Sequence, residues 1–240
     1  MALTAEAGQD VALNRTTQAY SELRSMIISG HYPPDSRLTE SDLTSQLGVS
    51  RGTIRSVLAR LAQDGYVTAE INRGARTRSF SIEEAAEILE SREVLESALA
   101  AKAAERATDD DIAAMTATCE GMWAQQIPGG REEYNKLNRE FHKQVQAAAR
   151  QAMLTKFVES LLYPLVVRQY RDVDRPHPRP QSVREHEAIL AAIATRNPEA
   201  AAAAMRHHLS SARRALQLQP GTPAGGSSTD PELPTGSSVY

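Results

Sequence analysis

Residues with metal-ligating side chains stand at helical spacing in the second half of the chain. In the segment NKLNREFHK, Asn138 and His142 are four residues apart, so in a helix both project from one face. Imidazole nitrogens with an oxygen donor suit zinc, nickel or another first-row divalent ion. A helical histidine is, however, more often solvated or a hydrogen-bonded core residue. The residues alone leave both interpretations open.

Two further histidines, His186 and His208, lie within helical stripes of apolar residues that are predicted to face inward. The apolar neighbours are Val183, Ile189, Leu190, Met205 and Leu209. His207 is the alternative inward residue in the last stripe, and we prefer His208. His177, within RPHPRP, is expected in a loop that faces solvent.

A second kind of chemistry is indicated by the arginines of the first third. Residues 15–79 hold nine arginines and no lysine against six acidic residues, a net charge of +3. The whole chain carries −3, so the remainder carries −6 (−3 − 3). A basic module joined to an acidic one favours a nucleic-acid reader fused to a domain with another role. Chance unevenness is the alternative.

Composition excludes several other classes. The single cysteine, Cys119, rules out an internal disulfide framework and a cysteine-rich zinc finger, and is expected to pack as a small apolar residue. No apolar run approaches the roughly 18 residues that span a bilayer, and the N-terminus lacks a signal core. We expect a soluble, cytoplasmic protein with no membrane partner.

The elements of the first third fit a winged helix-turn-helix. A helix is predicted from about Thr16 to Ser29, and the segment GHYPPDSRL ends it. Thr39 and Ser50 are expected to cap two further helices. Two short strands are predicted around a tight turn at 72–74.

The helix after Ser50 divides into two faces. Its apolar residues, Ile54, Val57, Leu58 and Leu61, form a buried stripe, and the opposite side carries Arg51, Gly52, Thr53 and Arg55. A recognition helix needs this division, because its polar N-terminal turn enters the major groove. Solvated surface arginines are the alternative for any one of these residues.

From residue 82 to about 216 the pattern is helical almost throughout. Helices are predicted over 82–106, 109–126, 131–149, 151–172, 180–195 and 198–216, with a capping signal at Thr108. The fold class is therefore mainly α: a winged helix-turn-helix over 15–79 and an all-α bundle over 80–216. Residues 1–14 and the Pro/Gly/Ser-rich 217–240 are predicted to be disordered tails.

The first module resembles the winged helix of the GntR family of bacterial transcription regulators. The motif residues are the glycine and proline of ISGHYPP, the Leu-x-Glu of LTE, the turn GVSR, the helix RSVLARL and the glycine of the wing, and the match covers nearly all of 15–79. Three positions depart from the family: Asp35 replaces a frequent glycine, Ser41 a phosphate-contacting arginine and Gly52 a common threonine. The resemblance implies DNA contacts by Arg37, Ser50, Arg51, Gly52, Thr53, Arg55, Arg73 and Gly74.

The second module is similar to the FCD-type effector domain of the FadR-like branch of this family, in its shorter, six-helix variant. The resemblance rests on ILESREVLESALAAKAAER, NREFHKQVQAAARQAML and VREHEAILAAIATRNPEAAAAAMRHHL. It implies a divalent metal site, zinc or nickel, held by Asn138, His142, His186 and His208. Asparagine replaces the common aspartate, so it brings an amide oxygen without charge.

Arg92 matches an arginine of that domain that could pair with an effector carboxylate; a helical salt bridge with Glu96 is the alternative. Together these features predict a homodimeric regulator, a repressor rather than an activator, that binds a palindromic operator and responds to a small acidic metabolite. We do not expect an enzyme. Metal-dependent catalysis in the helical domain and constitutive DNA binding without an effector are the alternatives.

Overall fold

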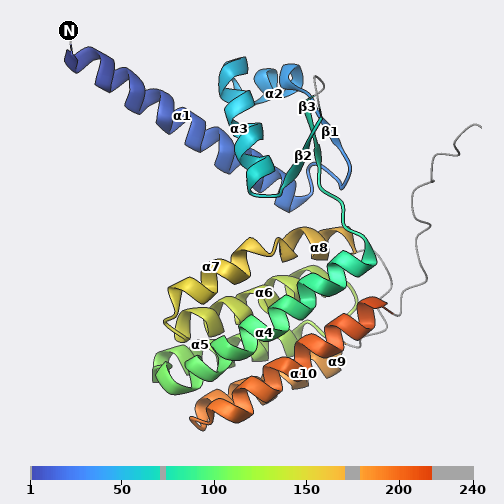
Figure 1. Cartoon of the computed structure of the whole chain (residues 1–240). Coiled ribbons are helices and arrows are strands. Elements are labelled where there is room, and N and C mark those ends of the chain that lie inside the picture. The colour runs from blue at the N-terminus through green and yellow to red at the C-terminus, as the bar shows by residue number, and fades with distance from the viewer. Residues whose placement is uncertain (1, 71–73, 171–178, 218–240) are drawn as a thin grey trace, which may run out of the picture.

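The computed structural model describes residues 2–70, 74–170 and 179–217, and their side chains from Asn14 onward with the exception of Arg179. The chain folds into a winged helix and a larger helical domain that lie one above the other (Figure 1). The predicted wing residue Arg73, the loop residue His177 and the tail from residue 218 lie outside the described residues.

The winged helix consists of α1 (Ala2–Ser29), β1 (Arg37–Leu38), α2 (Glu40–Leu47), α3 (Arg51–Gln63), β2 (Val67–Glu70) and β3 (Gly74–Thr77). The antiparallel sheet has the order β1-β3-β2, with Val67 opposite Thr77 and Arg37 opposite Arg76. The two predicted strands pair with each other, and most of the turn predicted at 72–74 lies outside the described residues. Strand β1 was not predicted, because two residues are too short to show alternation.

Helix α1 begins at Ala2 rather than near Thr16, so residues predicted as an unstructured tail are helical. The segment ALTAEAGQDVALN contains no proline and is rich in alanine and leucine, which favour helix even without an apolar stripe. The first half of α1 extends away from the rest of the winged helix (Figure 1).

Side-chain caps fix the start of α2 and α3, as the sequence predicts. The Thr39 hydroxyl oxygen accepts a hydrogen bond from the backbone N–H of Asp42, and Ser50 accepts one from Thr53, both at 3.2 Å. The stripe of α3 is buried: Ile54, Val57, Leu58 and Leu61. Because caps set where α3 starts and the stripe sets its rotation, the polar first turn faces outward.

The helical domain is built from α4 (Ile82–Arg106), α5 (Asp109–Ala124), α6 (Arg131–Ala148), α7 (Ala152–Ser160), α8 (Tyr163–Gln169), α9 (Arg179–Ala194) and α10 (Pro198–Gln217). Helix α4 packs against α6, α9 and α10 around the core (Figure 1). The prediction of one helix over 151–172 is wrong. Leu162 takes a left-handed conformation with φ of 58°, and Pro164 lies in the first turn of α8, so the chain bends there.

A shared apolar core joins the two domains. Leu23 and Ile27 of α1 belong to the same buried cluster as Leu162, Leu165 and Val166. None of the helices in the described part of the chain is long and apolar enough to cross a membrane.

Two glycines of the winged helix lie directly against the segment 162–168. Gly30 and Gly65 have φ of 83° and 79°. A Cβ on Gly30 would overlap the guanidinium of Arg168, which donates to the Gly30 carbonyl at 3.2 Å. A Cβ on Gly65 would lie 2.8 Å from Cδ1 of Leu162. Both glycines therefore permit the close approach of the domains as well as their own backbone conformation.

Candidate functional site

The first candidate site is the polar face at the start of α3. Arg51, Gly52 and Arg55 are exposed there, and Arg37, Arg51, Arg55 and Gly74 line one hollow of the winged helix. The fold thus brings together residues that are up to 37 positions apart in the sequence (74 − 37). An exposed set of arginines beside a helix N-terminus is suited to phosphates and to the guanine edge in the major groove.

Glu40 holds one of these arginines in place. Nε of Arg55 donates to both Glu40 carboxylate oxygens at 2.8 and 3.0 Å. The hydrogen bond to Glu40 raises the pKa of Arg55 above its usual value. Glu40 is the glutamate of the Leu-x-Glu motif, but the sequence assigned it no role, because its partner lies 15 residues away on another helix.

The second candidate site is a buried cluster of three histidines. His142 of α6, His186 of α9 and His208 of α10 each offer a ring nitrogen, and these nitrogens lie within 4.8 Å of one another. The Nε2 atoms of His142 and His208 are 3.3 Å apart. His208 is the buried member of the adjacent pair, whereas His207 is exposed and its Nε2 lies 3.8 Å from Oε1 of Glu185.

A second layer of acceptors orients these rings. Nδ1 of His142 lies 2.6 Å from Oε2 of Glu96, and Nδ1 of His208 lies 2.9 Å from Oε2 of Glu185. Nδ1 of His186 lies 2.7 Å from the backbone oxygen of Ser182, so this nitrogen must donate. Partners on Nδ1 fix the tautomer and direct Nε2 inward, as is typical of metal-bound histidines.

Burial and charge set the protonation of the cluster. Burial alone would raise the pKa of Glu96, but Arg92 and His142 lower it to about 2, so its carboxylate is ionised at neutral pH. Burial lowers the pKa of His208 to about 4, although Glu185 opposes this shift. His208 is therefore neutral, with a lone pair on Nε2, which is the form that binds a metal.

The Nε2 atoms of His142 and His208 face each other, and this arrangement restricts what can lie between the two rings. If Nδ1 of His142 and of His208 each donates to a carboxylate, both Nε2 atoms of neutral rings carry lone pairs 3.3 Å apart. Two such lone pairs repel unless a proton or a cation lies between the rings. The three imidazoles thus fit a first-row divalent ion.

Arg92 forms the helical ion pair that was one of its two predicted roles. Its Nε donates to Oε1 of Glu96 at 2.5 Å, and both side chains are buried. Its guanidinium carbon also lies 3.7 Å from the ring centroid of Tyr163, at the start of α8. The contact with an effector carboxylate stays a prediction.

Asn138 lines a cavity of about 550 Å³ together with His142 and Arg92. It is half-buried one helical turn before His142 on α6. The cavity therefore reaches the histidine cluster at His142.

The sequence did not reveal the roles of Glu185 and Ser182, and it indicated Glu96 only as a partner of Arg92. One signal was available for α9: Ser182, Glu185 and His186 lie within one helical turn and share the inward face. The contact between Glu96 and His142 spans 46 residues, and no local spacing reveals it.

A winged helix with an exposed arginine-bearing recognition helix, joined to a helical domain with a buried polar cluster, defines a DNA-binding regulator with a sensory domain. Comparison with known proteins agrees. The family of bacterial regulatory proteins named gntR matches residues 15–76, and the FCD domain matches residues 87–211.

The chain belongs to the GntR family and carries an FCD effector-binding domain. It is 30% identical over 185 residues to the Nta operon transcriptional regulator of Aminobacter aminovorans, covering 77% of this chain and 86% of that protein. It is 24% identical over 195 residues to the HTH-type transcriptional repressor RspR of Escherichia coli (strain K12), covering 80% and 84%.

Solved structures show the same fold. A GntR transcriptional regulator from Rhodococcus sp. RHA1 superposes with a TM-score of 0.70 at 25% identity, covering 85% of this chain and 98% of that chain. The fold of E. coli McbR/YncC superposes with a TM-score of 0.71 at 21% identity, covering 85% of this chain and 97% of that chain. The two relatives and the Rhodococcus protein are named as transcriptional regulators or repressors, so the catalytic alternative has no support among them.

Proposed function

We propose that this regulator is a homodimeric repressor that binds a palindromic operator and is controlled by a small carboxylate at a metal-containing site in its FCD domain. The observation that carries the proposal is the cluster of three buried imidazoles beside a cavity, coupled through a shared core to an arginine-bearing recognition helix. Such a protein works in the cytoplasm, where its DNA is.

Several features support repression by a dimer. Relatives of similar length include repressors by name, among them RspR and GlaR of Escherichia coli. A single recognition helix reads only a short half-site, so helix-turn-helix proteins pair to read two half-sites about one helical turn apart. Each copy is expected to insert the first turn of α3 in the major groove, with Ser50, Gly52 and Thr53 beside the arginines. Constitutive binding is the alternative, and it predicts no response to metal or ligand.

The donor set supports a divalent metal, zinc or nickel. His142, His186 and His208 would hold the ion through Nε2, and Asn138 would lend an amide oxygen from the cavity side. The ion would supply a positive charge that attracts a carboxylate ligand. The residues of this chain orient the rings through Glu96, Glu185 and Ser182, and they exclude bulk water by burying all three histidines.

DNA recognition is tested by selecting the operator from a random duplex library with the full-length protein and measuring affinity at fixed salt. Arg51→Ala and Arg55→Ala are each expected to weaken specific binding by about 1–3 kcal/mol. Arg60→Ala is the matched control, because Arg60 is exposed on the same helix but does not line the hollow beside its first turn. Unchanged affinity in both test variants would show that α3 is not the recognition helix.

The response is tested with the same operator and with zinc as the probe. A change in operator affinity on adding zinc, lost in His186→Ala while metal-free DNA binding persists, is the expected result. Identical behaviour of the wild type and His186→Ala would remove the cluster from regulation.

A further inference from the structure

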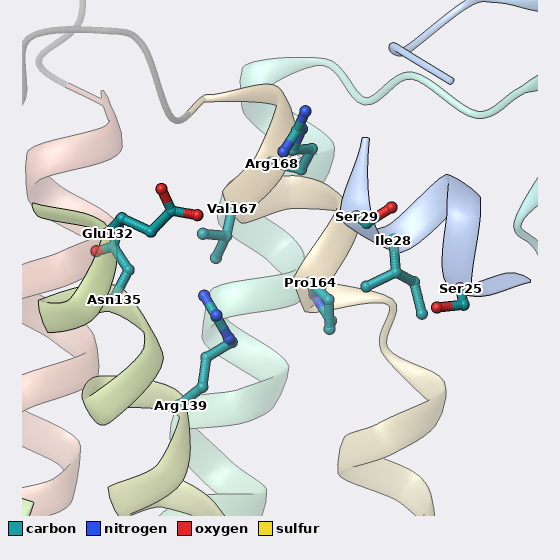
Figure 2. A pocket seen from close by; sticks show the side chains of 9 residues that line it. All are labelled: Ser25, Ile28, Ser29, Glu132, Asn135, Arg139, Pro164, Val167 and Arg168. Carbon is teal, nitrogen blue, oxygen red and sulfur yellow. The ribbon is translucent and has the colours of Figure 1, made fainter. Parts of the chain in front are cut away.

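A cleft between the two domains continues outward from the histidine cluster. The cavity that reaches Asn138 and His142 shares four lining residues, Ile28, Arg139, Pro164 and Val167, with a second hollow of about 340 Å³. The two hollows therefore adjoin each other, and α1, α6 and α8 contribute lining residues to both. Figure 2 shows the second hollow, with Arg139 reaching from α6 into the space between α6 and α8, and Ile28 and Ser25 on the α1 side.

The cleft is positively charged, although the chain as a whole is negative. Its lining includes Arg24, Arg92, Arg139, Lys143 and Arg168 against two acidic residues. Neither Arg139 nor Lys143 forms an ion pair with any residue in the described part of the chain. A partly enclosed site with unpaired cations recruits an anion, because its walls strengthen the field inside.

One of the cations belongs to the winged helix. Arg24 is on α1, and its Nε donates to the hydroxyl of Tyr66 at 2.7 Å. Its guanidinium carbon lies 5.0 Å from the centroid of that ring. Arg24 is therefore fixed to the DNA-binding domain, whereas Arg139 and Lys143 are fixed to the helical domain.

We propose that this cleft binds a small dicarboxylate that spans the two domains. One acidic group lies toward Asn138 and His142, and the second is held by Arg139 and Lys143, with Arg24 contacting it from the winged helix. The inference rests on the proposed function of a ligand-responsive regulator, and it adds a second anionic subsite and the class of ligand. The volumes of the two hollows are in the range of small-molecule sites.

The position of the ligand gives it a regulatory consequence. A molecule that contacts both domains favours the arrangement in which both sets of contacts are made. Dicarboxylate binding therefore adds contacts between the winged helix and the helical domain to those of their shared core, while a monocarboxylate occupies the inner end only and adds none.

The test is calorimetric titration of the zinc-loaded full chain, without DNA, using succinate, glutarate and adipate against butyrate and inorganic phosphate. At least one dicarboxylate is expected to bind about tenfold tighter than butyrate or phosphate. Arg139→Gln and Arg24→Gln should each weaken that dicarboxylate by about tenfold and leave butyrate within about twofold. Lys136→Gln, exposed on α6 outside the cleft, is the matched control and should change neither.

Three outcomes overturn the inference. Equal affinity for butyrate and the best dicarboxylate would remove the second subsite. Unchanged dicarboxylate affinity in Arg24→Gln would confine the ligand to the helical domain. Absence of binding by every dicarboxylate up to about 10 mM would remove the site. Operator and zinc binding are measured separately, so any of these results leaves the proposed DNA-binding regulator standing.

Discussion

Glu96 links the ion pair of Arg92 to the ring of His142, and Glu96→Gln tests both links with one change. The side chain is 1% exposed; Oε1 accepts from Arg92 at 2.5 Å and Oε2 lies 2.6 Å from Nδ1 of His142. Glutamine keeps the volume but removes the charge, so the buried guanidinium loses its counter-ion. Breaking a buried pair from one side costs about 3–5 kcal/mol.

The pKa of Glu96 gives the size of this free-energy loss by a second route. The pKa of Glu96 falls from 4.5 to about 2 through Arg92 and His142, against the opposing effect of burial. That difference corresponds to about 3 kcal/mol in favour of the ionised carboxylate. The folded-state pKa is lowered, so this stability is present above pH 4.5 and is lost as the pH falls toward 2. At pH 7 we expect Glu96→Gln to lower the free energy of unfolding by about 3 kcal/mol.

Urea denaturation of metal-free protein at pH 7, followed by circular dichroism, measures this loss. Glu105→Gln is the control, because Glu105 pairs with Lys102 on the same helix at 2.9 Å but both side chains are about 40% exposed. An exposed pair of this kind contributes at most about 1 kcal/mol. Zinc affinity should fall by about 10- to 100-fold in Glu96→Gln, because Glu96 orients a ligand ring. Equal, small effects of the two substitutions on stability and on zinc affinity would refute the reasoning.

Three further predictions concern the fold. Gly30→Ala should destabilise the protein more than Gly48→Ala does, as measured by thermal denaturation. Both glycines have a positive φ, which costs alanine about 1–2 kcal/mol. Only Gly30 also lies against Arg168, so only its substitution adds a steric overlap. Equal losses would show that the glycine is needed only for its backbone angle. Cys119 should resist a thiol reagent at pH 8 until the protein unfolds, because burial raises the pKa of this single thiol to about 12; rapid labelling of native protein would contradict its burial. Thr108→Ala should cost about 1 kcal/mol by urea denaturation, since the Thr108 hydroxyl and the Asp111 carboxylate cap α5 reciprocally; no loss would show that water replaces the cap.

Several helix boundaries were predictable because local chemistry sets them. Thr39, Ser50 and Thr108 cap helices as their side chains and the following sequence indicate, and α4 has the predicted bounds of 82–106. The break near Leu162 was not predicted, because the apolar run SLLYPLVV continues through it. There, tertiary packing of the turn against Gly65 accompanies a conformation that local propensity does not favour.

The three histidines could be predicted from the sequence, whereas their hydrogen-bond partners could not. His142, His186 and His208 could be selected because each lies on an apolar helical stripe and follows the order of a known family. Their partners Glu96 and Glu185 could not be ranked above other acidic residues from sequence, since their contacts join separate helices. The interdomain cleft could not be predicted from the sequence, because its shape depends on how α1 packs against α8.

The metal content of purified, tag-free full-length protein tests the central claim most directly. The measurement compares the wild type with a His142→Ala, His186→Ala, His208→Ala variant by elemental analysis, before and after incubation with zinc or nickel. The account predicts about one equivalent per chain in the wild type and none in the variant. A wild type that holds no metal even after incubation, or a variant that holds as much as the wild type, would contradict it.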